Sequence, residues 1–125
     1  MTYKEERNIE TFFIQHPESL VLFIMIRNFI KSLGPVTIQI QKTQISFSSG
    51  TKFAWVWLPQ TWVKRPENSI TLSFTLKRWI EHELITDVFG PRYGRWMHRI
   101  LITKDSEFEE TKNWVWEAYF ECLRR

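Results

Sequence analysis

The segment best suited to chemistry in this chain is Arg92-Tyr93-Gly94-Arg95-Trp96. Two guanidinium groups, separated by a glycine-containing loop and accompanied by two rings, can stack on a planar ligand and pair with its acidic group. A surface loop whose arginines lie over neighbouring apolar groups accounts for the same residues equally well. The segment is therefore a candidate ligand site, with Arg92 and Arg95 as its cations.

Two further pairs of residues are candidates for ligand contacts. Lys42 and Thr43 lie at a turn predicted between two apolar strands. An ammonium and a hydroxyl there can hold a carboxylate or phosphate, although a solvated lysine and a turn-stabilising threonine are the simpler interpretation. Trp55 and Trp57 lie two residues apart on one predicted strand. They either line a cleft together with the Arg92–Trp96 segment or belong to the core, and we favour the core.

His98 is the one candidate for acid–base chemistry. It is in phase with Trp96 and Ile100 on a predicted strand, which favours a semi-buried histidine over a catalytic one. Cys122 is the only cysteine, and no CxxC or HxxxH spacing occurs. We therefore expect no zinc site, no cofactor, no intrachain disulfide and no catalytic residue.

Composition is that of an ordinary globular chain with an uneven charge distribution. The 125 residues fit one domain and include seven Trp and ten Phe. Residues 42–104 carry ten basic and four acidic groups, a net +6, although the whole chain carries only +3. This basic middle predicts a surface that prefers anions. The N-terminus lacks signal-peptide character and the longest apolar run is short, so we expect a cytoplasmic protein.

Hydrophobic periodicity predicts an α+β fold. We expect helices over residues 8–14, 17–33 and 105–123, and strands over residues 36–40, 45–47, 52–58, 70–76 and 95–102. The strand over 52–58 is apolar on both faces, with Phe53, Trp55 and Trp57 on one of them, and this predicts burial from both sides. Residues 59–69 and 79–94 are predicted to be loop or irregular. We therefore expect an antiparallel meander of about five strands with the N-terminal and C-terminal helices on one face.

Several segments resemble a bacterial family called domain of unknown function 5655. They are Ser32-Leu33-Gly34-Pro35-Val36-Thr37-Ile38, Gln41-Lys42-Thr43-Gln44-Ile45-Ser46-Phe47, Phe53-Ala54, the stretch from Gly90-Pro91-Arg92 to His98, and Trp116-Glu117-Ala118-Tyr119. The resemblance covers about residues 17–123. The family has no established activity and is similar in layout to small bacterial domains, some of them discussed as iron chaperones.

The resemblance also implies site residues. Its pattern points to Lys42, Thr43, Phe47, Phe53, Lys77 or Arg78, and His98. Where family members often carry paired histidines, this chain has Met97-His98-Arg99, which weakens a metal-binding interpretation.

These observations favour a non-catalytic binding module for an anionic small molecule, held in a basic, Trp-rich concavity. The expected ligand-binding residues are Lys42, Thr43, Trp55, Trp57, Arg78, Arg92, Arg95 and His98. The alternatives are a single-stranded nucleic-acid binder or a protein-interaction module. A His-dependent enzyme or an iron-chaperone-like protein ranks below them.

The helices show more apolar surface than one sheet face covers. On the final helix, Trp116 and Phe120 lie outside the main apolar stripe, so we expect a homodimer with Trp116 near its centre. The competing hypothesis is that the first helix, with Phe12, Phe13 and Ile14, folds back over this surface within one chain.

Overall fold

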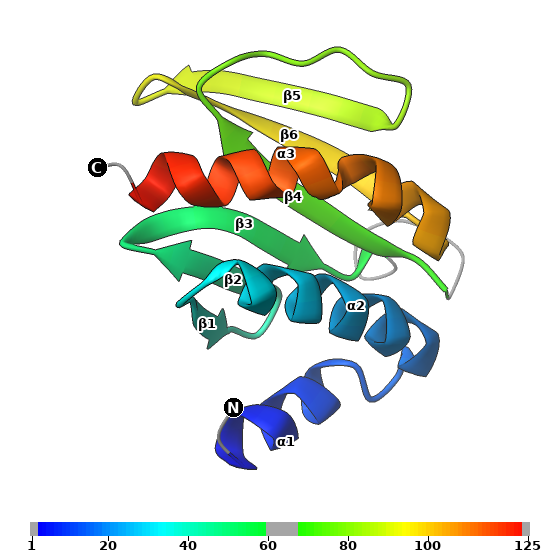
Figure 1. The fold of residues 1–125 in the computed structure, drawn as a ribbon. Helices are drawn as coiled ribbons and strands as arrows, with labels where there is room; N and C mark the ends of the chain where they lie inside the picture. Colours follow the sequence, from blue (N-terminus) through cyan, green and yellow to red (C-terminus); the bar gives the residue numbers. More distant parts are fainter. Residues whose placement is uncertain (1–2, 60–67, 124–125) are drawn as a thin grey trace.

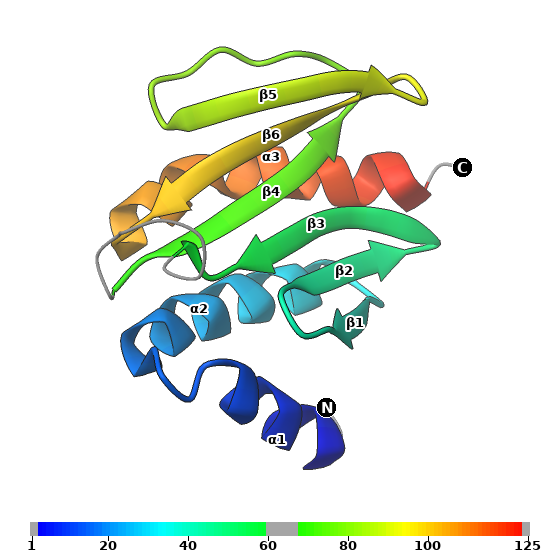
Figure 2. The same ribbon diagram turned by 180° about the vertical axis from the view of Figure 1, so that it is seen from behind.

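The computed structural model of this chain describes residues 3–59 and 68–123. Its helices are α1 (Tyr3–Phe12), α2 (Pro17–Leu33) and α3 (Asp105–Leu123), and its strands are β1 (Thr37–Ile40), β2 (Ile45–Ser49), β3 (Thr51–Trp57), β4 (Ile70–Leu76), β5 (Ile85–Arg92) and β6 (Arg95–Ile102). The fold is α+β, as predicted. Figure 1 shows α2 and α3 side by side on one face of the sheet, and Figure 2 shows the opposite face without a helix.

The six strands form one antiparallel sheet with the order β1-β2-β3-β4-β6-β5. The predicted meander holds from β1 to β4. The chain then passes to the edge of the sheet before β6 returns between β4 and β5. β5, which makes the sixth strand, falls within the residues 79–94 predicted to be irregular.

β5 was missed because its sequence lacks the pattern of a buried strand. It is an edge strand, mostly exposed, and its pairing with β6 is interrupted near both ends. Pro91 lies in one of these irregular stretches, where a missing N–H costs no ladder hydrogen bond. Periodicity cannot identify a strand whose two faces are both largely solvated.

The core lies between the sheet and helices α2 and α3. Phe74 pairs with Ala54 and His98 across the sheet, and all three are fully buried. The Phe74 ring stacks on Trp114 of α3 at 6.0 Å. Because side chains alternate along a strand, this register fixes which residues face the helices and which face away.

The prediction that β3 is buried from both sides, with Phe53, Trp55 and Trp57 on one face, is wrong. A register shift in the β2–β3 pairing leaves Phe53 without a cross-strand partner. This bulge turns Phe53 toward the helices, where its ring contacts Tyr119 at 5.5 Å. Trp55 and Trp57 instead lie half-buried on the face without a helix, hereafter the open face.

The first helix begins earlier than predicted, at Tyr3, and packs against α2. Ile9 and Phe13 are buried, and the Phe13 ring lies 5.2 Å from Phe23 of α2. The first helix therefore covers part of the extra apolar surface of α2, whereas Val21 and Ile24 stay exposed. Trp116 of α3 stays 50% exposed and contacts Phe120 at 4.6 Å.

The predicted bounds of α2 and α3 agree with the structure. At the start of α3 the Glu107 carboxylate accepts hydrogen bonds from the backbone N–H groups of Thr103 and Lys104 and from the Thr103 hydroxyl. These bonds satisfy N–H groups that a helix leaves free, and they lower the pKa of Glu107 although burial opposes them. Part of the predicted loop 59–69 lies outside the described residues.

None of the helices in the described part of the chain is long and apolar enough to span a lipid bilayer.

Candidate functional site

The open face carries a concavity of about 550 Å³ where β3 begins and β4 ends. Three cations and three rings line it: Lys52, Trp55, Phe89, Arg92, Tyr93 and Arg95. Among the residues that the structure describes, no acidic side chain lines it. The volume is within the range of small-molecule sites, and the cations give it a positive character.

A tight hairpin turn brings the two predicted arginines to this concavity. Arg92 and Arg95 are cross-strand partners, so the connection between β5 and β6 is only Tyr93 and Gly94. Both have positive φ, 53° and 74°, which is the conformation of a type I′ turn. Glycine adopts it without strain, and the turn leaves Tyr93 85% exposed at the rim of the concavity.

Arg95 is the most unusual residue of the site, because it is buried and has no counter-ion among the described residues. Only 7% of it is exposed. Its guanidinium donates to the Cys122 thiol at 3.1 Å and to the Glu121 carbonyl at 3.4 Å, and its Nε has no hydrogen-bond partner. No carboxylate of the described residues forms an ion pair with it. A buried charge that is not paired is costly, so the fold holds Arg95 against an electrostatic penalty.

The rings of the concavity come from three separate strands or turns. Trp55 lies on β3, Phe89 on β5 and Tyr93 in the hairpin turn, while the Arg92 guanidinium lies 5.4 Å from the Tyr93 ring. Lys52, at the start of β3, supplies the third cation. Sequence reasoning missed Lys52 and Phe89, because only the pairing of β3, β4, β6 and β5 brings them to Arg95.

Five of the eight predicted ligand-binding residues, among them Lys42, Thr43 and Trp57, lie outside the concavity. Lys42 and Thr43 are exposed in the connection between β1 and β2, which is the far end of β2 from the concavity. Trp57 lies on the open face but two residues further along β3 than Trp55, toward that far end. The structure therefore separates Lys42 and Thr43 from the arginines.

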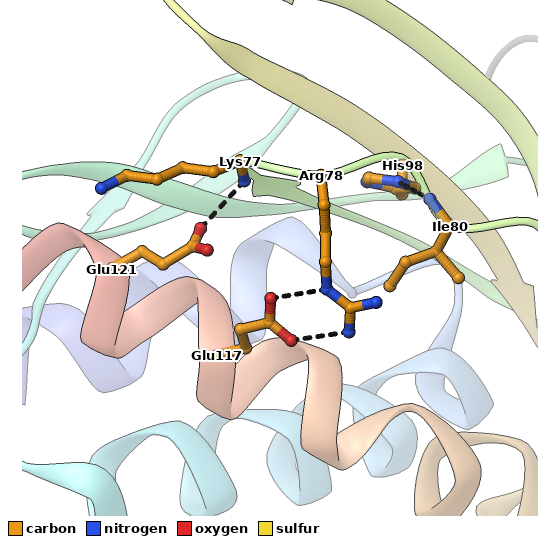
Figure 3. A network of polar contacts seen from close by, with 6 residues as sticks. All are labelled: Lys77, Arg78, Ile80, His98, Glu117 and Glu121. Carbon is orange, nitrogen blue, oxygen red and sulfur yellow. Dashed lines mark hydrogen bonds and ion pairs between the residues drawn. The ribbon is translucent and has the colours of Figure 1, made fainter.

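Arg78 and His98 belong to a different network, on the helix-covered face (Figure 3). Arg78 donates to both carboxylate oxygens of Glu117 at 2.8 Å, and the Lys77 backbone N–H donates to Glu121. The hydrogen bond with Glu117 raises the pKa of Arg78, and Arg78 lowers the pKa of Glu117. Arg78 therefore joins the sheet to α3 and contributes nothing to the concavity.

His98 is fully buried and stacks on Phe74 at 5.3 Å. Its Nε2 accepts a hydrogen bond from the Ile80 backbone N–H at 3.0 Å, which requires an unprotonated nitrogen. Burial lowers the pKa of His98, although the nearby Trp96 and Phe74 backbone carbonyls oppose the shift. The geometry is that of a neutral histidine within the fold, away from the concavity.

A second cluster of rings and charge adjoins the concavity on the open face. The Arg99 guanidinium lies 4.4 Å from the Trp57 ring and 4.9 Å from the Phe89 ring. Its Nε and the Trp57 Nε1 have no hydrogen-bond partner, and Asp87 lies 3.9 Å from the guanidinium. Phe89 therefore belongs to both the cluster and the concavity.

Within residues 3–59 and 68–123, no group of three or more His, Cys, Asp or Glu side chains is arranged to hold a metal ion.

Comparison with known proteins identifies the family. A family model described as "Domain of unknown function (DUF5655)" matches residues 10–120, and the chain belongs to this family. Neither the curated proteins nor the solved structures contain a match.

Proposed function

We propose that this domain is a non-catalytic binding module for an anionic small molecule with a planar ring, held in the concavity at Arg95. The observation that carries the proposal is the buried Arg95 guanidinium, which has no carboxylate partner among residues 3–59 and 68–123. An anionic group at this position would supply the missing counter-charge in a poorly hydrated place, where an ion pair is stronger than in water.

The other lining residues fit the same ligand. Lys52 and Arg92 add positive charge at the rim, and Trp55 and Phe89 offer faces on which a ring can stack. The buried hydroxyl of Thr75, which has no hydrogen-bond partner, adds a donor or acceptor. The lining offers no histidine, carboxylate or thiol for acid–base or nucleophilic work, which favours binding over catalysis.

A thermal-shift screen tests the proposal. We expect nucleotides, phosphosugars or aromatic carboxylates to raise the melting temperature, because a ligand that binds only the folded state stabilises it by mass action. Arg92→Ala should reduce the shift. Lys42→Ala, which removes one positive charge at the far end of β2, is the matched control and should leave it unchanged. Equal shifts in both variants would contradict the proposed site.

We also propose a cytoplasmic location and a bacterial source for the domain, as the resemblance and the composition suggest.

We further propose a homodimer through α3, with Trp116 and Phe120 at its interface. Trp116 is half-exposed on the helix, and large rings concentrate binding energy in interfaces. Trp116→Lys should convert a dimer into a folded monomer in sedimentation velocity. A wild type that sediments as a monomer up to high micromolar concentration would contradict this proposal.

A further inference from the structure

The open face beyond the concavity bears a second ring and a second cation within reach of the same ligand. Trp55 of the concavity and Trp57 of the neighbouring cluster are two residues apart on β3 and point to the same face. Residues i and i+2 of a strand are about 6.7 Å apart. That is about twice the 3.4 Å between stacked bases of one strand in duplex DNA.

This spacing suits a ligand with two separate planar groups, one of which stacks on Trp55 and the other on Trp57. Single-stranded nucleic acid binds proteins in this manner, because every base has a face that can stack on an aromatic ring. The cluster also offers the Arg99 guanidinium, which lies between Trp57 and Phe89. Arginine contributes to such stacking through its charge and its planar shape.

Charge along the open face favours a ligand with several negative groups. Arg95, Arg92 and Lys52 line the concavity and Arg99 follows along β6, whereas Asp87 is the acidic side chain near this path and already lies 3.9 Å from Arg99. Phosphates spaced along a chain match this distribution, since each can meet a separate cation.

Polar atoms that have no partner among residues 3–59 and 68–123 lie along the same path. Ser73, on β4 between Trp55 and Arg99 in the sheet register, is fully buried, and its hydroxyl makes no hydrogen bond. The Trp57 Nε1 and the Arg99 Nε likewise have no partner. Buried polar groups are normally satisfied, so three orphaned ones on one face call for a hydrogen-bonding ligand.

We propose, on the basis of the function proposed above, that the ligand is a single-stranded oligonucleotide. One nucleotide occupies the concavity, with its phosphate at Arg95 and its base against Trp55. The next base stacks at the cluster of Trp57, Arg99 and Phe89. The open face thereby binds at least two successive nucleotides and reads little sequence, because stacking accepts any base.

Calorimetric titration with thymidine 5′-monophosphate and with the dinucleotide pTpT tests this inference. We expect the dinucleotide to bind at least about tenfold tighter, because a second base adds a stacking contact. Trp57→Ala should remove that gain and leave mononucleotide binding unchanged. Trp116→Ala, the same substitution on the helix-covered side, should change neither. Trp57→Leu, which keeps apolar volume without a ring, serves if the alanine variant is poorly folded by circular dichroism.

The matching uridylates, UMP and pUpU, form a second arm that separates DNA from RNA as the source of the strand. Equal affinity for mononucleotide and dinucleotide in both arms, or equal weakening of both by Trp57→Ala, would overturn the inference and leave the proposed function intact. If aromatic carboxylates bind but no nucleotide does, the inference is likewise overturned and the proposed function stays intact. Failure of every anion to bind would overturn the proposed function as well.

Discussion

Two arginines contact helix α3, Arg78 from the segment after β4 and Arg95 from the start of β6, and their surroundings differ in kind. Arg78 is more than half exposed, with 57% of its side chain accessible, and it has a bidentate carboxylate partner in Glu117. Arg95 is buried and contacts only a thiol and a backbone carbonyl. Within the described part of the chain, the exposed guanidinium of Arg78 thus has a carboxylate partner, whereas the buried guanidinium of Arg95 has none.

The same contrast holds for the two faces of the sheet. On the helix-covered face, rings such as Phe53 and Phe74 pack against other rings and are fully buried. On the open face, Trp55 and Trp57 are only half-buried and lie beside cations. Similar residues are therefore fully buried in the core on one face and partly accessible to solvent on the other.

The largest difference between the faces should appear in the free energy of unfolding. Phe74→Ala removes a fully buried ring and should cost about 3 to 5 kcal/mol, because a cavity remains beside Trp114 and His98. Trp55→Ala should cost clearly less, since its ring is half-buried. Urea unfolding followed by circular dichroism measures both. Equal losses would show that the open face contributes to the core.

Arg95→Met should separate binding from stability. Replacing a buried, unpaired charge by an apolar side chain of similar length is often neutral or stabilising. We therefore expect the free energy of unfolding to stay within about 1 kcal/mol of the wild type, while stabilisation by anions disappears. The measurement is a urea curve with and without the best anion of the screen. If the variant is strongly destabilised but is still stabilised by anions, Arg95 serves the fold and not the binding of anions.

His98 should make the stability of the helix-covered face depend on pH. Its pKa is lowered in the folded protein, so the unfolded chain takes up the proton first. The contribution of His98 to the free energy of unfolding is fully present above about pH 6.5, the pKa of histidine in the unfolded chain. It decreases as the pH falls from there toward the lower pKa of His98 in the folded protein. A protonated Nε2 also loses the hydrogen bond from Ile80.

Urea midpoints measured between pH 7.5 and pH 5 test this dependence. His98→Asn should flatten the profile over that range. His82→Asn is the control, because His82 also accepts a backbone N–H, from Leu84, but is exposed. If both variants retain the slope of the wild type, His98 is not its source.

The smallest effect is expected at the ion pair. Glu117→Gln should cost less than about 1 kcal/mol, because solvent screens a pair with a largely exposed Arg78. The cost should fall further in 1 M salt. If Glu117→Gln instead lowers the free energy of unfolding by several kcal/mol and salt does not change this loss, the ion pair behaves like a buried one.

Sequence alone determined the local elements with strong periodicity. The residues from Pro17 to Leu33 and from Asp105 to Leu123 form helices as predicted, because proline, glycine and acidic residues mark their ends and apolar residues repeat at helical spacing. The family, the α+β class and the candidate segment from Arg92 to Trp96 were accessible in the same way. Each of these depends on residues close together in the chain.

Only the tertiary structure decided which face each strand side chain occupies and which candidates share one site. A single bulge at Phe53 reversed the predicted face of one ring, since side chains alternate with a period of two and one extra residue inverts the pattern. The edge position of β5 brought Phe89 to Arg95, whereas Arg78 pairs with Glu117 of α3 and His98 stacks on Phe74, both away from the concavity. The order of strands and the residues that meet across them are set by long-range packing, which a local pattern does not encode.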